Sequence, residues 1–390
     1  MKSIHILFAL SCLLIINACK EEDNKRVATT AVNSDARFEA LPINQIQYIG
    51  SHNSYRLRTT DKLFDFAQKL KPILSPLGLN PDEWDYTHLP ITEQLDLGLR
   101  TFELDIYNDP SGGKFYNRAG NALVGLPVAS GIDALKKPGM KIIHIPDMDY
   151  NTHYYTFVDA LAGIRNWSIQ HPSHLPIFIM VELKDFSIGN VLPFFAKALP
   201  FDESAMNKVD EEINGVFDRT NLLFTPDDLR KSYPNIKTAL ETEGWPTVKA
   251  MRGKIIIIAY HNDAYLTNHP NLENRKMFMY VNEDSPNAAF IIKDGSQDSY
   301  DDIQRLVNQG YIVRTRADAG TDEARTEDYT NMNAAFTSGA QLISTDYYVP
   351  DFRAGANGWS YYKVSFDGNT FNRTNVLNTS TDIAGQYIMP

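Results

Sequence analysis

The amino-acid sequence predicts an α/β fold, a single (β/α)8, TIM-barrel-like domain with a short irregular C-terminal extension. Short apolar runs rich in Val and Ile alternate with segments of helical character from Ile43 onward, which is typical of a largely parallel sheet. Neither a linker nor an internal repeat interrupts residues 43–352, so we expect one large domain. No Gly-rich phosphate loop follows the first strand, and the length fits a barrel better than a doubly wound sheet.

The predicted strands are short apolar runs bounded by turn residues. They are Ile46–Gly50, Arg100–Ile106, Lys141–Ile145, Ile177–Leu183, Lys254–Tyr260, Phe278–Val281, Phe290–Lys293, Ile312–Arg316 and Gln341–Thr345. The predicted helices lie between them, at residues 61–70, 156–170, 190–199, 226–241, 299–309 and 325–338. One helix start is clear, because Thr225-Pro226-Asp227-Asp228 places a cap residue, a first-turn proline and two early acids in order. We expect the barrel over residues 42–352, with the Asn-, Thr- and Gly-rich tail at 353–390 packed on it.

Composition and charge exclude several classes of protein. The chain has 390 residues, of which 43% are hydrophobic, and its 37 basic and 48 acidic residues give a formal net charge of −11. Such a chain can bury a sizeable core and is neither disordered nor fibrous. The acidic balance argues against a nucleic-acid partner. Because both cysteines, Cys12 and Cys19, lie in the first twenty residues, the body of the chain has no disulfide, Cys-ligated zinc or thiolate nucleophile.

The N-terminal segment has the pattern of an export signal. Lys2 precedes an apolar run, Ile4–Ile16, that is too short for a transmembrane helix of about 20 residues. Ile16-Asn17-Ala18-Cys19 resembles a bacterial lipobox, and the acidic stretch that follows Cys19 resembles the surface-export tag of Bacteroidetes lipoproteins. We therefore expect a signal peptide over 1–18, a lipid anchor on Cys19, a flexible tether over 19–41 and a surface-exposed outer-membrane lipoprotein. An ordinary secretory peptide with an accidental Cys is the alternative.

Polar and ionisable side chains gather where the predicted strands end. These side chains are His52, Asn53, Glu103, Asp105, His144, Glu182, Lys184, Arg314, Arg316, Asp318 and Asp346. The spacing of two puts Glu103 and Asp105 on one side of their strand. Because the carboxyl ends of barrel strands form the catalytic face, we expect these groups to lie together. For Asp147 and Asp149, just after His144, a loop role is favoured over a place beside a metal ion.

These residue types suit a metal-assisted phosphodiester site. Carboxylates and an amide are hard oxygen ligands, which favour Ca²⁺ or Mg²⁺ over zinc or copper. Three carboxylates packed together without a cation would have raised pKa values. His52 and His144 can divide general base and general acid work near neutral pH. Arg or Lys at the rim can hold a phosphate or a head group, although Arg314 and Arg316 can instead pair with Asp318 or Asp346.

The ordered motifs resemble those of one enzyme family. Ile49-Gly50-Ser51-His52-Asn53-Ser54-Tyr55 and Gly98-Leu99-Arg100-Thr101-Phe102-Glu103-Leu104-Asp105 resemble the catalytic half of phosphoinositide-specific phospholipases C. His144 and Glu182 lie where that family has its second histidine and its last calcium ligand. The segments Thr225–Arg230, Arg314–Asp318 and Ser344–Tyr347 are similar to the bacterial calcium-dependent members. The likeness covers roughly residues 43–352.

The resemblance implies an activity and a role for each residue. One Ca²⁺ ion, or less favourably Mg²⁺, would be bound by Asn53, Glu103, Asp105 and Glu182. His52 would stabilise the phosphoryl group or transfer a proton, and His144 would protonate the departing diacylglycerol oxygen. The inositol 2-hydroxyl would attack the phosphorus of a phosphatidylinositol-type lipid, giving diacylglycerol and a cyclic inositol phosphate that water can open. The expected substrate contacts are Lys184, Arg314, Arg316 and Asp346.

Two other functions stay open at this point. The pairing Glu182-x-Lys184 also resembles glycerophosphodiester phosphodiesterases, which share the barrel and do not require a neighbouring hydroxyl on the substrate. A non-catalytic surface binding lipoprotein is the second alternative, although the presence of both histidines and all proposed ligands counts against it. A phospholipid or phosphodiester substrate, a membrane contact through the N-terminal anchor and a monomeric state complete the expectations.

Overall fold

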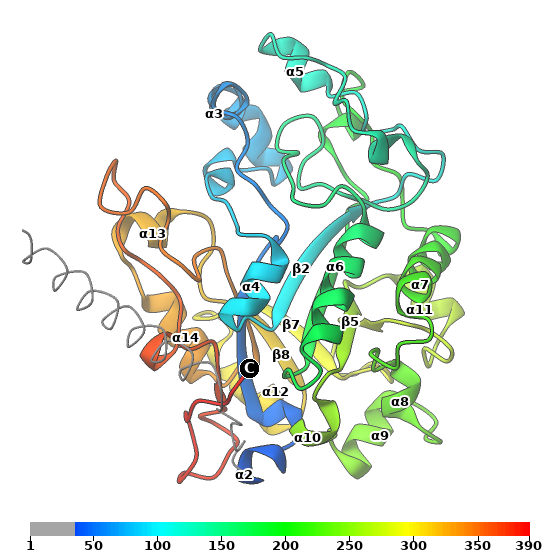
Figure 1. Ribbon diagram of the computed structural model, residues 1–390, viewed down its shortest axis with the longest axis vertical. Coiled ribbons are helices and arrows are strands. Elements are labelled where there is room, and N and C mark those ends of the chain that lie inside the picture. The colour runs from blue at the N-terminus through cyan, green and yellow to red at the C-terminus, as the bar shows by residue number, and fades with distance from the viewer. Residues whose placement is uncertain (1–35) are drawn as a thin grey trace, which may run out of the picture. The chain divides into compact units, whose positions relative to one another are not determined.

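The computed structural model describes residues 36–390, and in this part of the chain eight parallel strands form a nearly closed barrel (Figure 1). Around the barrel the strands follow the order β6-β5-β4-β2-β1-β9-β8-β7. They are β1 (Ile46–Ser51), β2 (Thr101–Tyr107), β4 (Ile177–Leu183), β5 (Ile255–Ala259), β6 (Phe278–Met279), β7 (Phe290–Gly295), β8 (Ile312–Arg316) and β9 (Leu342–Thr345). A parallel bridge between Tyr280 and Phe290 joins the two ends of this order. The predicted barrel is confirmed.

Apolar side chains fill the barrel and attach the helices to it. Strand β5 is an example, because its sequence Ile-Ile-Ile-Ile-Ala is buried throughout, as expected for a parallel strand covered on both faces. The helices are α2 (Ala36–Glu39), α3 (Asp61–Leu74), α4 (Ile91–Leu97), α5 (Ala119–Leu123), α6 (Phe157–Gln170), α7 (Glu203–Phe217), α8 (Pro226–Arg230), α9 (Ile236–Glu243), α10 (Val248–Met251), α11 (Asp263–Asn268), α12 (Tyr300–Asn308), α13 (Asp322–Thr326) and α14 (Thr330–Thr337). Among residues 36–390, none of them has the length and apolar character that crossing a bilayer requires.

Two further strands lie outside the parallel order. Strand β3 (Lys141–Ile142) pairs antiparallel with the end of β2, so the prediction of a third barrel strand over Lys141–Ile145 was wrong. Strand β10 (Asn372–Thr374) pairs antiparallel with the first half of β1. The C-terminal extension therefore packs on the barrel through a regular pairing as well as through buried side chains such as Tyr362 and Ile388.

Several helices differ from the sequence prediction for local reasons. Residues 190–199 form no α-helix, because the Ser187 and Asn190 side chains cap only a short 3-10 turn. Helix α7 instead begins at Glu203, after the N-cap residue Asp202, whose side chain accepts a hydrogen bond from the Ala205 amide. The helix predicted over 226–241 is divided into α8 and α9 because Lys231 adopts a left-handed φ of 52°.

A second apolar cluster supports the loops at the carboxyl end of the barrel. This satellite cluster consists of Leu63, Ala67, Leu74, Trp84, Tyr107, Phe115, Ile143, Ile145, Met148, Tyr150, Ile188 and Ala198. Its members come from α3, from the segments around α5 and β3, and from the segment after β4. Figure 1 shows α3 and α5 at one end of the barrel, away from α8–α10. These loops therefore have a small core of their own.

The expected N-terminal features lie mostly outside the described residues. The signal peptide over 1–18, the lipid anchor on Cys19 and the tether up to residue 35 belong to this part of the chain. The last residues of the predicted tether are described, and there Phe38 and Leu41 pack against the barrel core. The compact unit therefore begins at Phe38, a few residues before the predicted start of the barrel.

Candidate active site

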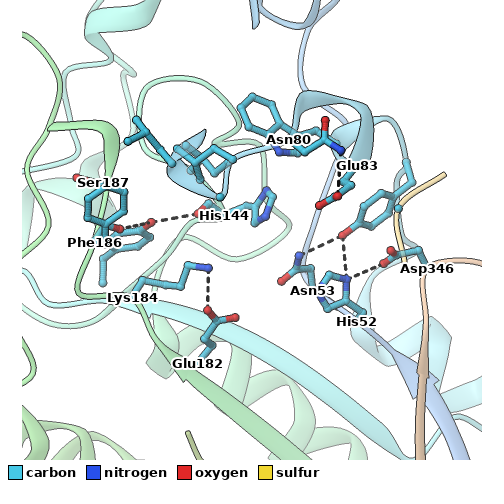
Figure 2. A pocket seen from close by; sticks show the side chains of 18 of the residues that line it. His52, Asn53, Asn80, Glu83, His144, Glu182, Lys184, Phe186, Ser187 and Asp346 are labelled. Carbon is cyan, nitrogen blue, oxygen red and sulfur yellow. Dashed lines mark hydrogen bonds and ion pairs between the residues drawn. The ribbon is translucent and has the colours of Figure 1, made fainter. Parts of the chain in front are cut away.

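The carboxyl ends of β1, β2, β4, β8 and β9 surround one pocket (Figure 2). Its cavity of about 270 Å³ is lined by most of the residues that the sequence singles out, namely His52, Asn53, His144, Glu182, Lys184, Arg316 and Asp346. Glu103 and Asp105 are buried next to it, each about 1% exposed. Arg314 is not part of the pocket wall, because its guanidinium is buried against Glu103 and Asp294.

The turn after β1 positions the first two of these residues. Asn53 adopts a left-handed φ of 46°, which Asn tolerates better than most residues. The turn is bonded to β2 on both sides, since Ser54 N donates to Glu103 O at 2.9 Å and Glu103 N donates to Ser54 Oγ at 2.8 Å. Gly50 allows this close approach, because a Cβ there would lie 1.7 Å from Thr101 O. His52 and Asn53 are therefore held directly beside Glu103.

Glu103, Asp105 and Glu182 form the acidic centre of the site. One oxygen from each of the three carboxylates lies within 4.8 Å of the others, and in residues 36–390 this is the one group of acidic, His or Cys side chains close enough to share an ion. Glu103 accepts from Tyr260 Oη at 2.8 Å and from Arg314 Nη2 at 3.1 Å. Lys184 Nζ lies 3.2 Å from Asp105 and 2.9 Å from Glu182.

The electrostatics of this acidic centre call for a cation. Burial raises the pKa of Asp105 well above its ordinary range, and the charges of Glu182 and Glu103 add to burial while Lys184 opposes it. Burial also acts to raise the pKa of Glu103, but Arg314 and His52 outweigh it and hold that pKa below its usual value. A divalent cation beside Asp105 would stabilise the ionised form of all three carboxylates.

The Asn53 amide provides a fourth oxygen for such an ion. One end of the amide lies 3.0 Å from an Asp105 oxygen, and the other lies 3.1 Å from Tyr86 Oη. With its nitrogen toward Asp105 the amide donates a hydrogen bond, whereas with its oxygen toward Asp105 it offers a ligand to a shared ion. Three carboxylates and an amide oxygen are the donors that Ca²⁺ prefers. The residues present therefore fit Ca²⁺.

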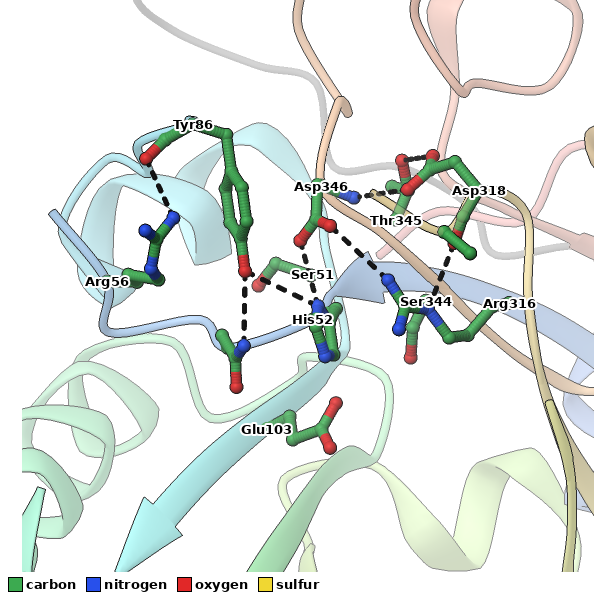
Figure 3. A network of polar contacts seen from close by, with 12 residues as sticks. Ser51, His52, Arg56, Tyr86, Glu103, Arg316, Asp318, Ser344, Thr345 and Asp346 are labelled. Atoms are coloured by element: carbon green, nitrogen blue, oxygen red, sulfur yellow. Dashed lines mark hydrogen bonds and ion pairs between the residues drawn. The ribbon is translucent and has the colours of Figure 1, made fainter. Parts of the chain in front are cut away.

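His52 is fixed by the carboxylate of Asp346, which follows β9, the strand that pairs with β1 in the barrel (Figure 3). Its Nδ1 lies 3.0 Å from Asp346 Oδ1, and Arg316 Nη2 lies 3.4 Å from the other oxygen of Asp346. Burial raises the pKa of Asp346, but His52, His88 and Arg316 outweigh it and hold that pKa well below the usual range. An ionised Asp346 fixes the Nδ1–H tautomer of His52 and leaves its Nε2 for the pocket.

His144 is also fixed by a carboxylate, although it follows β3, a short strand outside the parallel barrel. Its Nδ1 lies 2.6 Å from Asp149 Oδ2, and Arg56 Nη2 lies 2.7 Å from the same oxygen. Burial lowers the pKa of His144 to about 4, and the hydrogen bond to Asp149 only partly opposes this shift. His144 is therefore neutral near pH 7, with Nδ1–H donated to Asp149.

Arg56 and Tyr86 connect the two histidines, and sequence analysis missed both. The guanidinium of Arg56 is fully buried, donates to the carbonyls of Trp84 and Tyr86, and stacks 4.2 Å from the centre of the Tyr86 ring. The Tyr86 hydroxyl in turn lies 3.4 Å from His52 Nδ1. No spacing rule indicates a functional role for Arg56. Its position three residues after Asn53, in an otherwise buried turn, is the one feature that could have pointed to it.

Asp149 corrects a second expectation, because it holds His144 and is more than a loop residue. Asp147 does have a loop role, since its carboxylate accepts from the amides of Ala119 at 2.6 Å and Ala196 at 2.7 Å. Among the expected substrate contacts, Lys184 and Arg316 line the pocket, and Asp346 does so while bonded to His52. Substrate contacts by Arg314 stay a prediction, because in the structure it supports Glu103.

A parallel barrel whose carboxyl end carries an acidic centre that fits a divalent cation, with two carboxylate-bound histidines beside it, is typical of a metal-dependent phosphodiesterase. The family model of Ca²⁺-dependent phosphoinositide phospholipases C matches residues 41–376. The chain belongs to this family of phosphoric diester hydrolases, whose activity requires Ca²⁺.

Two of the solved structures that are similar to this chain come from a Pseudomonas species and from Streptomyces antibioticus. The calcium-dependent phosphoinositol-specific phospholipase C of a Gram-negative Pseudomonas species, in a myoinositol complex, is 16% identical over 89% of this chain and 100% of that chain, with a TM-score of 0.48. The Ca²⁺-dependent phosphatidylinositol-specific enzyme of Streptomyces antibioticus is 14% identical over 79% and 95% of the two chains, also with a TM-score of 0.48. A sequence search finds no significant relative among curated proteins. Family membership therefore rests on the family model.

Proposed function

We propose that the pocket cleaves the glycerol–phosphate bond of phosphatidylinositol-type lipids through attack by the inositol 2-hydroxyl. The 2-hydroxyl oxygen forms a bond to phosphorus, the bond from phosphorus to the glycerol oxygen breaks, and the products are diacylglycerol and a cyclic inositol phosphate. The arrangement that carries this proposal is a pair of histidines, His52 and His144, each fixed by a buried carboxylate in one pocket beside the acidic centre.

Each histidine has a defined role in proton transfer. His52 accepts the proton of the 2-hydroxyl or stabilises the phosphoryl oxygens, and His144 returns a proton to the departing glycerol oxygen. Because the pKa of His144 is about 4 in the substrate-free pocket, it must gain its proton once a phosphate is present. A phosphate anion nearby raises a histidine pKa, which permits this uptake.

Ca²⁺ would be bound by Glu103, Asp105, Glu182 and the Asn53 oxygen. When bound, it supplies positive charge that offsets the phosphoryl oxygens and eases deprotonation of a nearby hydroxyl. Arg316, 19% exposed at the pocket wall, contributes a fixed positive charge for the substrate phosphate.

The test is head-group release followed by phosphorus NMR. Phosphatidylinositol should give a cyclic phosphodiester signal with Ca²⁺ and no product in excess chelator. His52→Ala and His144→Ala should each lower kcat by about 10²–10⁴-fold, the usual value for a general acid or base. His261→Ala is the matched control, because His261 is 51% exposed and pairs with Asp263 outside the pocket. Full activity in chelator would exclude the proposal. Hydrolysis of choline diesters as fast as inositol diesters would also exclude it and would favour a glycerophosphodiester-type enzyme.

We propose further that the enzyme is a monomeric outer-membrane lipoprotein exposed at the cell surface. The support is the lipobox-like Ile16-Asn17-Ala18-Cys19 and the acidic residues after it, in a part of the chain outside the described residues. Metabolic labelling with a radioactive fatty acid should mark the wild type and leave Cys19→Ala unlabelled. A labelled Cys19→Ala protein, or an unlabelled wild type, would contradict the anchor.

A further inference from the structure

Lys184 contacts two of the three carboxylates that a Ca²⁺ ion would need. Its ammonium lies 2.9 Å from Glu182 Oε1 and 3.2 Å from Asp105 Oδ2. Figure 2 shows this ammonium in the pocket, between the Glu182 carboxylate and the His144 ring. The side chain is 21% exposed, so it is neither fixed in the core nor free in solvent. Lys184 is therefore an internal counter-ion of the acidic centre.

The three carboxylates have separate positive partners. Arg314 is 1% exposed and contacts Glu103 at 3.1 Å, and further contacts to Ser344 and Asp294 fix its position. Lys184 serves Asp105 and Glu182, and residues 36–390 provide no third bond that would fix its ammonium in place. Only the lysine partner can therefore leave without disturbing the barrel core.

An ammonium and a Ca²⁺ ion compete for the same oxygens. The ion needs carboxylate oxygens at about 2.3–2.6 Å, so it would lie within roughly 6 Å of an ammonium that bonds those same oxygens. Two positive charges at that separation, in a buried setting, repel each other strongly. The flexible four-carbon stem of lysine allows its ammonium to move while the backbone stays in place.

We propose that Ca²⁺ displaces the Lys184 ammonium from Asp105 and Glu182 and so delivers it to the substrate phosphate. Lys184 then binds phosphate only after the ion has bound, which makes the two binding events positively coupled. This inference rests on the proposed function for the identity of the phosphate ligand. The competition with Ca²⁺ depends only on the acidic centre.

The first measurement is calorimetric titration of the full chain with Ca²⁺ alone. Lys184→Met removes the competing charge and keeps an unbranched side chain, so Ca²⁺ should bind about tenfold more tightly than to the wild type. Lys208→Met is the matched control, because Lys208 is exposed on α7 and pairs with Glu211 outside the pocket, and this variant should bind Ca²⁺ as the wild type does. Equal or weaker Ca²⁺ binding by Lys184→Met would overturn the competition.

The second measurement separates displacement from simple repulsion. Inorganic phosphate is titrated into the wild type and into Lys184→Met, each in chelator and in saturating Ca²⁺. In chelator the two proteins should bind phosphate equally, because Lys184 is engaged by the carboxylates. In saturating Ca²⁺ the wild type should bind phosphate at least about fivefold more tightly than Lys184→Met does. A difference of the same size in both conditions would mean a fixed phosphate-binding lysine, and no difference in either would mean a counter-ion that never moves; both results contradict the proposal.

Neither measurement uses turnover, so failure of the phospholipase C activity and failure of this inference are distinguishable. A protein that binds Ca²⁺ and phosphate as expected but releases no inositol phosphate would contradict the proposed function alone. If Lys184→Met does not fold, Lys184→Gln keeps a polar donor on a shorter unbranched side chain and removes the same charge. Thermal unfolding of each variant in chelator, followed by circular dichroism, shows which one to use.

Discussion

The two histidines of the pocket share one plan but have different supports. In each, Nδ1 bonds a buried aspartate that an arginine also contacts, as His52–Asp346–Arg316 and as His144–Asp149–Arg56. In the first set, His52 and Asp346 directly follow the barrel strands β1 and β9, and Arg316 is the last residue of β8. In the second, His144 and Asp149 come from the loop after β3, which packs on the satellite cluster.

This difference shows where the site is rigid and where it depends on few bonds. Asp346 divides its partners between two oxygens, and its own amide donates to Asp318 at 2.9 Å. Asp149 places His144 and Arg56 on a single oxygen, Oδ2, and its Oδ1 has no hydrogen-bond partner in the described part of the chain. In the set on the loop after β3, the position of Asp149 therefore depends mainly on its ion pair with Arg56. We expect this set to be the more sensitive of the two.

The largest expected effect is the loss of unfolding free energy when the arginine of either set is replaced. Arg56→Met leaves Asp149 as an unpaired buried charge, and breaking such a pair costs about 3–5 kcal/mol of unfolding free energy. Arg316→Met removes a longer contact of 3.4 Å at a side chain that is 19% exposed, so we expect about 1–2 kcal/mol. Urea unfolding of both variants measures the difference. Equal losses would show that the two supports are equivalent.

The two aspartates separate catalysis from stability. Asp149→Asn and Asp346→Asn each remove the acceptor that fixes a histidine tautomer, so kcat should fall by about 100-fold or more in both. Asp149→Asn should also lower the unfolding free energy more, because the Arg56 charge left without its carboxylate is fully buried whereas that of Arg316 is 19% exposed. Steady-state kinetics and urea unfolding test both parts. Wild-type kcat in either variant would exclude a positioning role for that carboxylate.

Tyr86→Phe should have a smaller effect, on the His52 side alone. The hydroxyl lies 3.4 Å from His52 Nδ1 and 3.1 Å from the Asn53 amide, so its loss frees an amide that we assign to Ca²⁺. We expect Ca²⁺ to bind about three- to tenfold more weakly, the value of one hydrogen bond. Calorimetric titration with Ca²⁺ measures this change. Unchanged Ca²⁺ affinity would show that Asn53 does not need Tyr86.

The last prediction concerns pH. Burial and the Asp346 charge raise the pKa of Asp318 to about 7, so the folded protein binds a proton there that the unfolded chain releases near pH 4. The stability that Asp318 contributes is therefore complete at low pH and is lost as the pH rises toward 7. Asp318→Asn should flatten the pH dependence of the unfolding free energy between pH 4 and 7. Thermal unfolding across that range measures the slope, and an unchanged slope would contradict the assignment.

The sequence predicted the barrel-borne half of the site better than the loop-borne half. Glu103, Asp105 and Glu182 interrupt apolar strands, and strand ends in a barrel meet at one edge, so their proximity followed from periodicity. His144 was predicted from a third barrel strand that does not exist, since β3 is short and antiparallel. It reaches the pocket through the loop that the satellite cluster supports.

Arg56, Asp149 and Tyr86 could not be predicted because their partners are distant in sequence and join through loops. Arg56 and Asp149 are 93 residues apart, and no periodic pattern connects them. Tyr86 follows an excursion containing α3, whose path depends on the packing of the satellite cluster. Burial of a charge is also a property of the folded chain, so only the structure shows that Arg56 is enclosed.

The central claim is that the acidic centre binds Ca²⁺ between the two histidines. A crystal structure of the protein grown with Ca²⁺, with anomalous scattering to locate the ion, tests it most directly. We predict one ion at about 2.3–2.6 Å from oxygens of Glu103, Asp105 and Glu182, with the Asn53 amide oxygen turned toward it. An ion bound elsewhere, or none near these carboxylates at saturating Ca²⁺, would contradict the account.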